Sequence, residues 1–316
     1  MQHDFTYEKQ IIEKKFEGIV GQEDVKEQLK SAILMKRNTI IVGSPGIGKT
    51  TLVRNLINIL PEKITNKNGE EKKEKPPFIR VQGSPDLTAE DLIGDIDPVK
   101  AMTHGPLSLE AFTPGKIFKA DGGILFFDEV NRCSEKLQNA LLQALEEKKV
   151  TIGSYDVDLN ANFIFIGTMN PEEASTEPLS DVFLDRFDLI YMEPPETLEQ
   201  EKRIVNENGK KLTEFPEELL GMSLKFIRAL RESKDLEKKP SVRASLGIYE
   251  RAQANAYLKQ RTKVELKDIE KAMISVLSHR IRLKPSLKYL KSTSDYIKET
   301  FTQFCESEES ESGGYP

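Results

Sequence analysis

Short apolar runs alternate with amphipathic stretches through the first two-thirds of the chain. Four of these runs predict β-strands: Asn38–Val42, Phe78–Gln82, Gly123–Phe127 and Phe163–Gly167. The last two, GILFF and FIFIG, lack polar alternation, as expected for strands that are buried on both faces of a sheet. Helical spacing occurs at Thr51–Leu60 and Leu137–Leu145. Strands that alternate with helices predict an α/β fold, an αβα sandwich with a central parallel sheet.

Two further segments interrupt this alternation. Residues Asn66–Lys75 (NKNGEEKKEK) are nearly all charged, and we predict a solvated loop insertion there. Residues Val150–Leu159 (VTIGSYDVDL) alternate in polarity around a Gly-Ser pair, which predicts a β-hairpin. The predicted fold class depends on neither segment.

The pattern changes at Pro194-Pro195. Four helical stretches follow, without a convincing strand: Thr197–Asn208, Pro216–Arg231, Arg243–Gln260 and Leu266–Arg282. We therefore expect an αβα domain at residues 1–195, an all-α domain at residues 196–296 and a C-terminal segment at residues 297–316. The last eleven residues, ESEESESGGYP, are acidic and low in complexity, which predicts a disordered tail.

Composition excludes several classes of protein. The 316 residues carry a formal net charge of -6, so the chain lacks the global basic surface that dominates nucleic-acid binding. Its two cysteines, Cys133 and Cys305, have no metal-ligand spacing, which fits a reducing compartment. No apolar run reaches the ~18–20 residues of a membrane span, and the N-terminal sequence MQHDFTYEKQ is not typical of a signal peptide. We expect a cytoplasmic protein with no membrane partner, and the charge argues against nucleic acid as a partner.

A phosphate-binding loop is predicted directly after the first strand. Residues 43–50 match the pattern G-x-x-x-x-G-K-[ST], with a β-rich run before them and a helical pattern after them. Its glycines let successive backbone N–H groups point toward phosphates, and the start of the helix adds its dipole. Lys49 would bring positive charge to the β- and γ-phosphates, and the Thr50 hydroxyl would coordinate Mg²⁺. The predicted nucleotide contacts are Gly43, Ser44, Pro45, Gly46, Ile47, Gly48, Lys49, Thr50 and Thr51.

A second element of the site follows the third predicted strand. Residues 123–129 read GILFFDE, an apolar strand that runs directly into two acidic residues. Ligands bind at the carboxyl ends of the strands in such sheets, which places Asp128 at the site. Asp128 should hold Mg²⁺ through its water shell, and Glu129 should orient and polarise the attacking water. Together with the phosphate loop, this pair predicts a Mg²⁺-dependent ATPase.

Four segments, in this order, resemble AAA+ ATPases and more narrowly the MoxR ATPases and the ATPase subunit of magnesium chelatase: GSPGIGKT, ILFFDEVNR, FIGTMNP and LDRFD. The resemblance covers roughly residues 16–285 and implies an AAA+ αβα domain followed by a helical lid domain. Val20, in the segment IVGQ, lies in what looks like the part that packs on the adenine. Asp91–Pro98 and Phe112–Gly115 are similar to the chelatase region where an insert interrupts the second helix, and Val150–Leu159 lies where this branch has a pre-sensor hairpin.

The resemblance implies roles for three further polar residues. Asn170 matches sensor 1, whose amide holds the water or the γ-phosphate; the alternative is an ordinary loop asparagine. Arg186 matches the arginine finger, which reaches the γ-phosphate of a neighbouring subunit; the alternative is a salt bridge with Asp185 or Asp188. Arg243, in SVRAS, matches sensor 2, acting on ATP in its own subunit or in the next one; the alternative is a capping or surface arginine.

An arginine that acts across an interface requires an oligomer, and the family implies a homo-oligomeric ring, most often a hexamer. Arg132 is a second candidate for such an arginine, or a helix cap. The leading hypothesis is a ring-forming ATPase motor that remodels or assembles a separate partner protein, for which a protein with a von Willebrand factor A domain is the family's precedent. The alternative is the motor subunit of a magnesium- or cobalt-chelatase complex, with the same catalytic residues.

Two other classes of function are disfavoured by the sequence. A nucleic-acid motor of this branch would need cations at its hairpin tip, and Gly153–Asp156 contains no lysine or arginine. A non-hydrolysing nucleotide sensor would not need the full set of predicted catalytic residues, which the chain contains: Lys49, Asp128, Glu129, Asn170 and Arg186.

Overall fold

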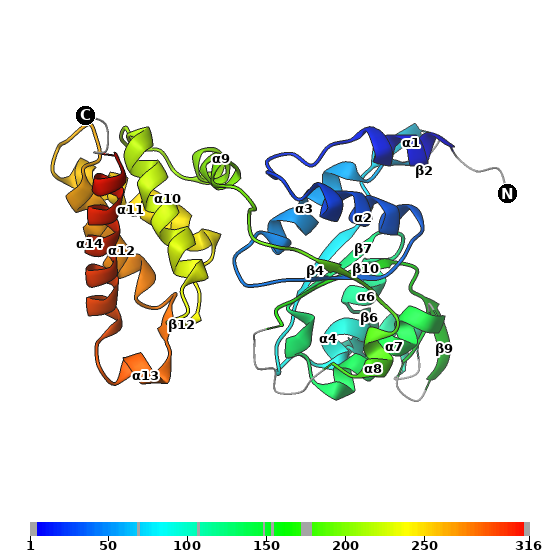
Figure 1. Cartoon of the computed structure of the whole chain (residues 1–316). Coiled ribbons are helices and arrows are strands. Elements are labelled where there is room, and N and C mark those ends of the chain that lie inside the picture. The colour runs from blue at the N-terminus through cyan, green and yellow to red at the C-terminus, as the bar shows by residue number, and fades with distance from the viewer. Residues whose placement is uncertain are drawn as a thin grey trace. The chain divides into compact units, whose positions relative to one another are not determined.

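The computed structural model of the chain describes residues 5–67, 70–105, 108–147, 149–152, 155–171 and 179–312. The chain has two compact units, each with its own hydrophobic core (Figure 1). The first unit consists of Met1–Glu17, Gln22–Ser44 and Gly48–Met192. The second consists of Gly18–Gly21, Pro45–Ile47 and Glu193–Pro316.

A five-stranded parallel sheet forms the centre of the first unit, in the order β11-β1-β10-β7-β4. Its strands are β1 (Thr39–Val42), β4 (Phe78–Gln82), β7 (Ile124–Asp128), β10 (Ile164–Met169) and β11 (Asp188–Tyr191). Every residue of β7 is buried, as predicted for a central strand. The four predicted strands are confirmed. Strand β11 was missed because its short sequence, DLIY, buries only Ile190 completely.

Helices cover both faces of this sheet, which confirms the predicted αβα sandwich. Figure 1 shows α1, α2 and α3 on one side of the strands and α4, α6, α7 and α8 on the other. These helices are α1 (Phe5–Glu13), α2 (Glu23–Leu34), α3 (Lys49–Ile59), α4 (Ala89–Ile93), α6 (Lys116–Lys119), α7 (Glu135–Glu147) and α8 (Asp181–Leu184). Helix α3 forms because its apolar residues recur at helical spacing, and Leu52, Val53, Leu56 and Ile59 are all buried.

Two antiparallel hairpins lie outside the main sheet. They are β2 (Lys63–Lys67) with β3 (Glu70–Glu74), and β8 (Lys149–Ile152) with β9 (Tyr155–Asn160). The prediction of a loop at residues 66–75 is therefore wrong for the part of that segment that the structure describes. Its charge argues against burial but not against a strand pair, because backbone groups make the ladder hydrogen bonds. The second hairpin confirms the prediction, and its tip residues Gly153 and Ser154 lie outside the described residues.

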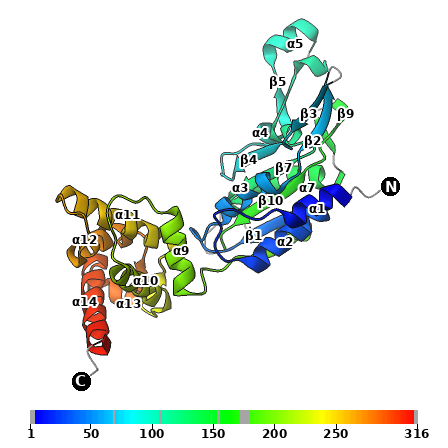
Figure 2. The same cartoon turned by 90° about the horizontal axis from the view of Figure 1, so that it is seen from above.

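A further insertion separates α4 from α6. It contains β5 (Gly94–Ile96), α5 (Pro98–His104), η1 (Leu109–Ala111) and β6 (Phe112–Pro114), and β5 pairs with β6. Figure 2 shows α5 at the far end of this insertion from the sheet. Gly94 has φ 120°, and a Cβ there would lie 2.3 Å from the Thr113 carbonyl oxygen, so only glycine fits. The insertion between α4 and α6 lies where the family resemblance implied an insert.

The second unit is mainly helical. It contains α9 (Leu198–Asn208), α10 (Glu217–Glu232), α11 (Val242–Leu258), α12 (Leu266–Leu277), α13 (Pro285–Lys288) and α14 (Thr293–Ser312). The four predicted helices are present, but α12 ends at Leu277 instead of at Arg282. Residues Arg282–Leu283 form β13, which pairs with β12 (Leu236–Lys238), so the expected absence of strands in this part was wrong.

The acidic end of the chain is helical where the structure describes it. Helix α14 spans 20 residues across position 296 and continues through the glutamates to Ser312, so the disorder predicted from residue 306 is wrong up to that point. Residues 313–316 lie outside the described residues. Buried Tyr296, Ile297 and Phe301 anchor the first half of the helix, and the second half continues from this fixed start. Of the helices in the described ranges, none has the length and apolar character to cross a lipid bilayer.

Candidate functional site

The phosphate loop joins β1 to α3, and its middle residues, Pro45–Ile47, are assigned to the second unit. Gly46 and Gly48 have φ values of 81° and 105°, in the left-handed region that favours glycine. Gly48 is the N-cap of α3, so the free N–H groups of the first helical turn begin at the end of the loop. The Lys49 ammonium donates to the carbonyl oxygens of Gly43 at 2.5 Å and Ser44 at 2.9 Å. These two hydrogen bonds hold the positive charge of Lys49 next to the loop backbone, where a phosphate-binding lysine has to lie.

Asp128 lies at the carboxyl end of β7 and is 6% exposed. The Thr168 hydroxyl donates to its Oδ1 at 2.6 Å, and the Thr50 hydroxyl lies 3.2 Å from Oδ1 and 3.3 Å from Oδ2. The Arg80 guanidinium donates to Oδ2 at 2.6 Å. The structure therefore brings together Thr50 and Asp128, the two residues predicted to hold Mg²⁺.

Glu129 has a different environment from the adjacent Asp128. Its backbone is left-handed, with φ 59° and ψ 54°, which is uncommon for a residue other than glycine. Its N–H donates to the Thr168 hydroxyl at 3.0 Å. Its Oε2 accepts hydrogen bonds from Gln82 at 2.9 Å and from Arg132 at 3.0 Å. The carboxylate is thus tethered but partly exposed, with access to a water molecule.

Arg132 occupies the short helix η2 (Val130–Arg132) and pairs with Glu129 of its own chain. Its action on a neighbouring subunit and its role as a helix cap both stay predictions. Sequence reasoning also missed Arg80, Gln82 and Thr168. Their one sequence signal is that they are polar residues toward the carboxyl ends of strands; the register that pairs Gln82 with Asp128 is seen in the structure.

Asn170 follows β10 and lies beside a second asparagine. The Asn131 amide donates to the Asn170 carbonyl oxygen at 3.3 Å. The Oδ1 atom of Asn131 is buried and lacks a hydrogen-bond partner among the described residues. A buried acceptor without a donor is unusual, and a bound water would satisfy it. Asn170 thus follows the fourth predicted strand, as expected, at the same edge of the sheet as Asp128, and its role as sensor 1 stays a prediction.

Arg186 follows α8 and is paired within its own chain. Its guanidinium donates to Glu146 Oε1 at 2.5 Å and to the Val182 carbonyl oxygen at 3.0 Å, and it lies 3.6 Å from Asp185. Asp188, the other predicted partner, pairs with Arg37 instead. Arg186 therefore forms the ion pair that was the alternative prediction, but its main partner is Glu146, which the sequence did not indicate. This pairing leaves the arginine-finger role as a prediction.

Val20 and Arg243, two further residues predicted to contact the nucleotide, are assigned to the second unit, as are Pro45, Gly46 and Ile47 of the phosphate loop. Val20 is buried, with 9% of its surface exposed. Arg243 lies in the first turn of α11. The contacts of both residues with a nucleotide stay predictions.

The donor set fits a magnesium–nucleotide complex better than a metal held by protein alone. Thr50 and Asp128 offer hard oxygen atoms that lie close together, which suits Mg²⁺. Among the residues described, no group of three or more histidine, cysteine, aspartate or glutamate side chains could form a metal cage. Mg²⁺ commonly keeps several waters and binds through one or two protein ligands plus phosphates. The residues present therefore fit Mg²⁺ that binds together with a nucleotide.

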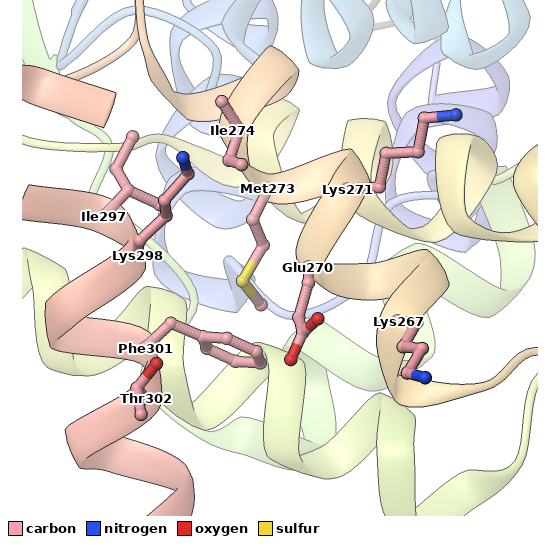
Figure 3. Close-up of a pocket in the computed structure, with 9 residues that line it drawn as sticks. All are labelled: Lys267, Glu270, Lys271, Met273, Ile274, Ile297, Lys298, Phe301 and Thr302. Carbon is pink, nitrogen blue, oxygen red and sulfur yellow. The ribbon is translucent and has the colours of Figure 1, made fainter. Parts of the chain in front are cut away.

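A pocket of about 440 Å³ lies in the second unit, between α12 and α14. Figure 3 shows its lining residues, which are Lys267, Glu270, Lys271, Met273, Ile274, Ile297, Lys298, Phe301 and Thr302. Met273, Ile297 and Phe301 are each at most 4% exposed, so the floor consists of packed core residues. None of the predicted site residues lines this pocket, and we assign it no ligand.

Comparisons with known proteins agree with this fold. Residues 38–187 match the AAA domain of the dynein-related subfamily, and residues 228–299 match the AAA lid domain. A magnesium-chelatase subunit ChlI homolog from Methanocaldococcus jannaschii is 30% identical over an alignment of 319 positions, and the alignment covers 85% of this chain and 86% of that protein. YeaC from Bacillus subtilis is 29% identical over an alignment of 295 positions, which covers 86% of this chain and 85% of that protein. A mutant RuvB structure from Thermotoga maritima shares the fold, with a TM-score of 0.52 at 18% identity over 82% of this chain and 71% of that one. The chain therefore belongs to the AAA+ ATPases, and its relatives include the ChlI subunits of magnesium chelatase.

Proposed function

We propose that the chain binds MgATP at the carboxyl edge of its sheet and hydrolyses it to ADP and phosphate. One observation carries this proposal: Asp128 at the end of β7 lies with its carboxylate 3.2 Å from the Thr50 hydroxyl of the phosphate loop, and the partly exposed Glu129 follows it directly. Phosphoryl transfer depends mainly on positioning and on neutralising charge, and these residues can do both.

Each residue of the loop has a part in holding the substrate. The loop N–H groups would bind phosphate oxygens, and Lys49 would exchange its bonds to the Gly43 and Ser44 carbonyls for bonds to the β- and γ-phosphates. Thr50 and Asp128 would hold Mg²⁺, Asp128 through water. Bound Mg²⁺ neutralises charge on the β- and γ-phosphates.

Glu129 would orient the attacking water and accept its hydrogen bond. Its side chain is 39% exposed, so a water molecule can reach it, whereas the buried Asp128 is better suited to a metal shell. Asn170 would hold the same water or the γ-phosphate. Val20 would pack on the adenine, and Arg243 would contact the phosphates as the second sensor.

The family resemblance further supports a homo-oligomeric ring of six subunits, the family's usual form, in which Arg186 acts on the neighbouring site. Arg186 is bonded to Glu146, so it would have to leave that carboxylate to reach a neighbour. An arginine in trans would stabilise charge in the transition state, and removing such groups costs several orders of magnitude in rate. ATP turnover per chain should therefore rise with protein concentration.

The test compares ATP turnover by wild type and by Glu129→Gln across a range of protein concentrations with Mg²⁺. Glu218→Gln, an exposed position on α10, removes the same charge away from the site and serves as the matched control. We expect wild type and the control to hydrolyse ATP, and Glu129→Gln to bind ATP without turning it over. Arg186→Ala should bind ATP normally and lose the concentration-dependent part of the rate. Equal turnover by Glu129→Gln and wild type would remove Glu129 from the mechanism.

The work done with this hydrolysis would be the remodelling or assembly of a separate protein, for which a von Willebrand factor A domain protein is a candidate. The ChlI relatives favour a second function, the motor subunit of a metal-chelatase complex.

Measuring the mass of the complex that the Glu129→Gln variant forms with ATP tests the ring directly. Proteins that co-purify with this variant, which holds ATP, separate the two functions: a metal-inserting subunit supports the chelatase function, and a von Willebrand factor A protein without one supports remodelling.

A further inference from the structure

The cation beside Asp128 in this structure is an arginine. The Arg80 Nη2 atom lies 2.6 Å from Asp128 Oδ2, and the Asp128 side chain is only 8% exposed. A buried carboxylate without a counter-charge is costly, and a charge-assisted hydrogen bond at this distance is strong. Arg80 thus supplies a counter-charge to this buried carboxylate.

The same carboxylate is the proposed ligand of Mg²⁺, so two cations would have to share it. A guanidinium at hydrogen-bond distance would repel a divalent ion in the same partly buried space. We propose that Arg80 is a built-in competitor of Mg²⁺ for Asp128, and that Arg80 leaves this carboxylate when MgATP or MgADP binds. The inference rests on the proposed function, because it concerns the same site.

Arg80 can leave Asp128 without a change in the fold. Its side chain is 41% exposed, so the guanidinium can move into solvent while β4 stays paired with β7. Its departure also affects Glu129. The Arg80 Nη2 atom donates to Gln82 Oε1 at 2.9 Å, and Gln82 Nε2 donates to Glu129 Oε2 at 2.9 Å.

These contacts form a continuous chain from the metal-binding carboxylate to the water-orienting one. Loss of the Arg80 bond frees the Gln82 amide to reorient, and with it one of the two hydrogen bonds that Glu129 Oε2 accepts; the other, from Arg132, does not involve Arg80. The arrangement couples occupation of Asp128 by metal to the Gln82–Glu129 hydrogen bond. Arg80 is therefore a positioning residue, because it acts through Asp128 and Gln82.

The first experiment measures binding of a fluorescent ADP analogue while free Mg²⁺ is titrated, using wild type, Arg80→Gln and Arg37→Gln. Arg37 is the matched control, since it also pairs with an aspartate on this sheet, Asp188, but in an exposed position. We expect Arg80→Gln to need about tenfold less free Mg²⁺ for half of the Mg²⁺-dependent gain in affinity, because the competing cation is gone. Arg37→Gln should match wild type. Affinity measured in EDTA should be nearly the same for all three.

A second experiment uses wild-type protein, so it does not depend on the folding of a variant. Structures determined with ADP in EDTA and with ADP and Mg²⁺ should differ at one contact: the Arg80–Asp128 hydrogen bond is present in the first and absent in the second. An unchanged Mg²⁺ midpoint in folded Arg80→Gln, or a hydrogen bond that persists with Mg²⁺ bound, overturns the inference while leaving the proposed function intact. Wild type that binds no nucleotide under any condition overturns both.

Discussion

A buried ion pair in the second unit permits a quantitative prediction of stability. Glu201, on α9, is fully buried and accepts two parallel hydrogen bonds from Arg231, with Nη1–Oε2 at 2.7 Å and Nη2–Oε1 at 2.6 Å. The Ser245 hydroxyl also donates to Oε1, and Arg228 lies 3.4 Å from Oε2. Arg231 itself is only 11% exposed on its side chain. The pair therefore ties α9, α10 and α11 together through charge that is almost entirely removed from water.

Replacing Glu201 by alanine leaves the Arg231 guanidinium buried without its counter-charge. The expected loss is about 3–5 kcal/mol in the free energy of unfolding of this unit. The double variant Glu201→Leu/Arg231→Met removes both charges and should recover most of this loss, because a hydrophobic pair of similar volume avoids the desolvation cost. Arg228 keeps partners in either variant, since it also donates to the carbonyl oxygens of Pro195 and Glu196.

Hydrogen exchange by mass spectrometry is the suitable assay, because a chain with two units need not unfold in a single transition. Peptides from α9, α10 and α11 should exchange at least about 100-fold faster in Glu201→Ala than in wild type, as a loss of this size implies. Peptides from α3, in the first unit, provide the internal control. Exchange in the double variant as fast as in Glu201→Ala would refute the reasoning, because it would show that packing, and not an uncompensated charge, sets the cost.

Three further predictions follow from individual contacts. Glu146→Ala removes the main partner of Arg186, but the pair is partly exposed, so the free energy of unfolding should change by less than about 1 kcal/mol in a urea titration; a larger loss would mean that this pair is structural. Burial raises the pKa of Cys133 to about 11, so iodoacetamide at pH 7.5 should modify Cys305 in the native protein and both thiols only in denaturant, as counted by mass spectrometry. Burial acts to raise the pKa of Asp268, but hydrogen bonds from a neighbouring arginine, a backbone N–H and a lysine outweigh it and hold the pKa below its ordinary value. Its stabilising contribution is therefore complete above about pH 4 and is lost as the pH falls through the native pKa, and Asp268→Asn should flatten this part of the melting temperature–pH curve measured by circular dichroism.

The parts of the fold that the sequence predicted are those in which local pattern and burial agree. The apolar runs of β7 and β10 are strands because both faces are covered, and the glycines of the phosphate loop have the backbone angles that its pattern implies. The acidic stretch after residue 305 was misjudged because composition says nothing of a helix already fixed by buried Ile297 and Phe301.

The part of the site that was missed depends on strand order, which sequence does not reveal. Arg80 and Gln82 occur in FIRVQ, where they look like the solvent-facing positions of an alternating strand. Only the order β10-β7-β4 places that strand beside Asp128. Thr168 was hidden for the same reason, since it lies on the other neighbour of β7. Sequence motifs thus predicted the residues to which a catalytic or binding role is assigned. The residues that hold these side chains in place become visible only through the pairing of strands.

The adjacent acids at the end of β7 raise a geometric problem that the backbone solves. Successive side chains of a strand point to opposite faces, so a regular strand would direct Asp128 and Glu129 to opposite sides of the sheet. The left-handed conformation of Glu129 breaks this alternation directly after the strand, at a cost of about 1–2 kcal/mol. Thr168 offsets that cost, because its hydroxyl accepts the Glu129 N–H and donates its own proton to Asp128. One buried hydroxyl therefore holds the Asp128 carboxylate and the Glu129 backbone, which places two consecutive acidic residues at a single edge of the sheet.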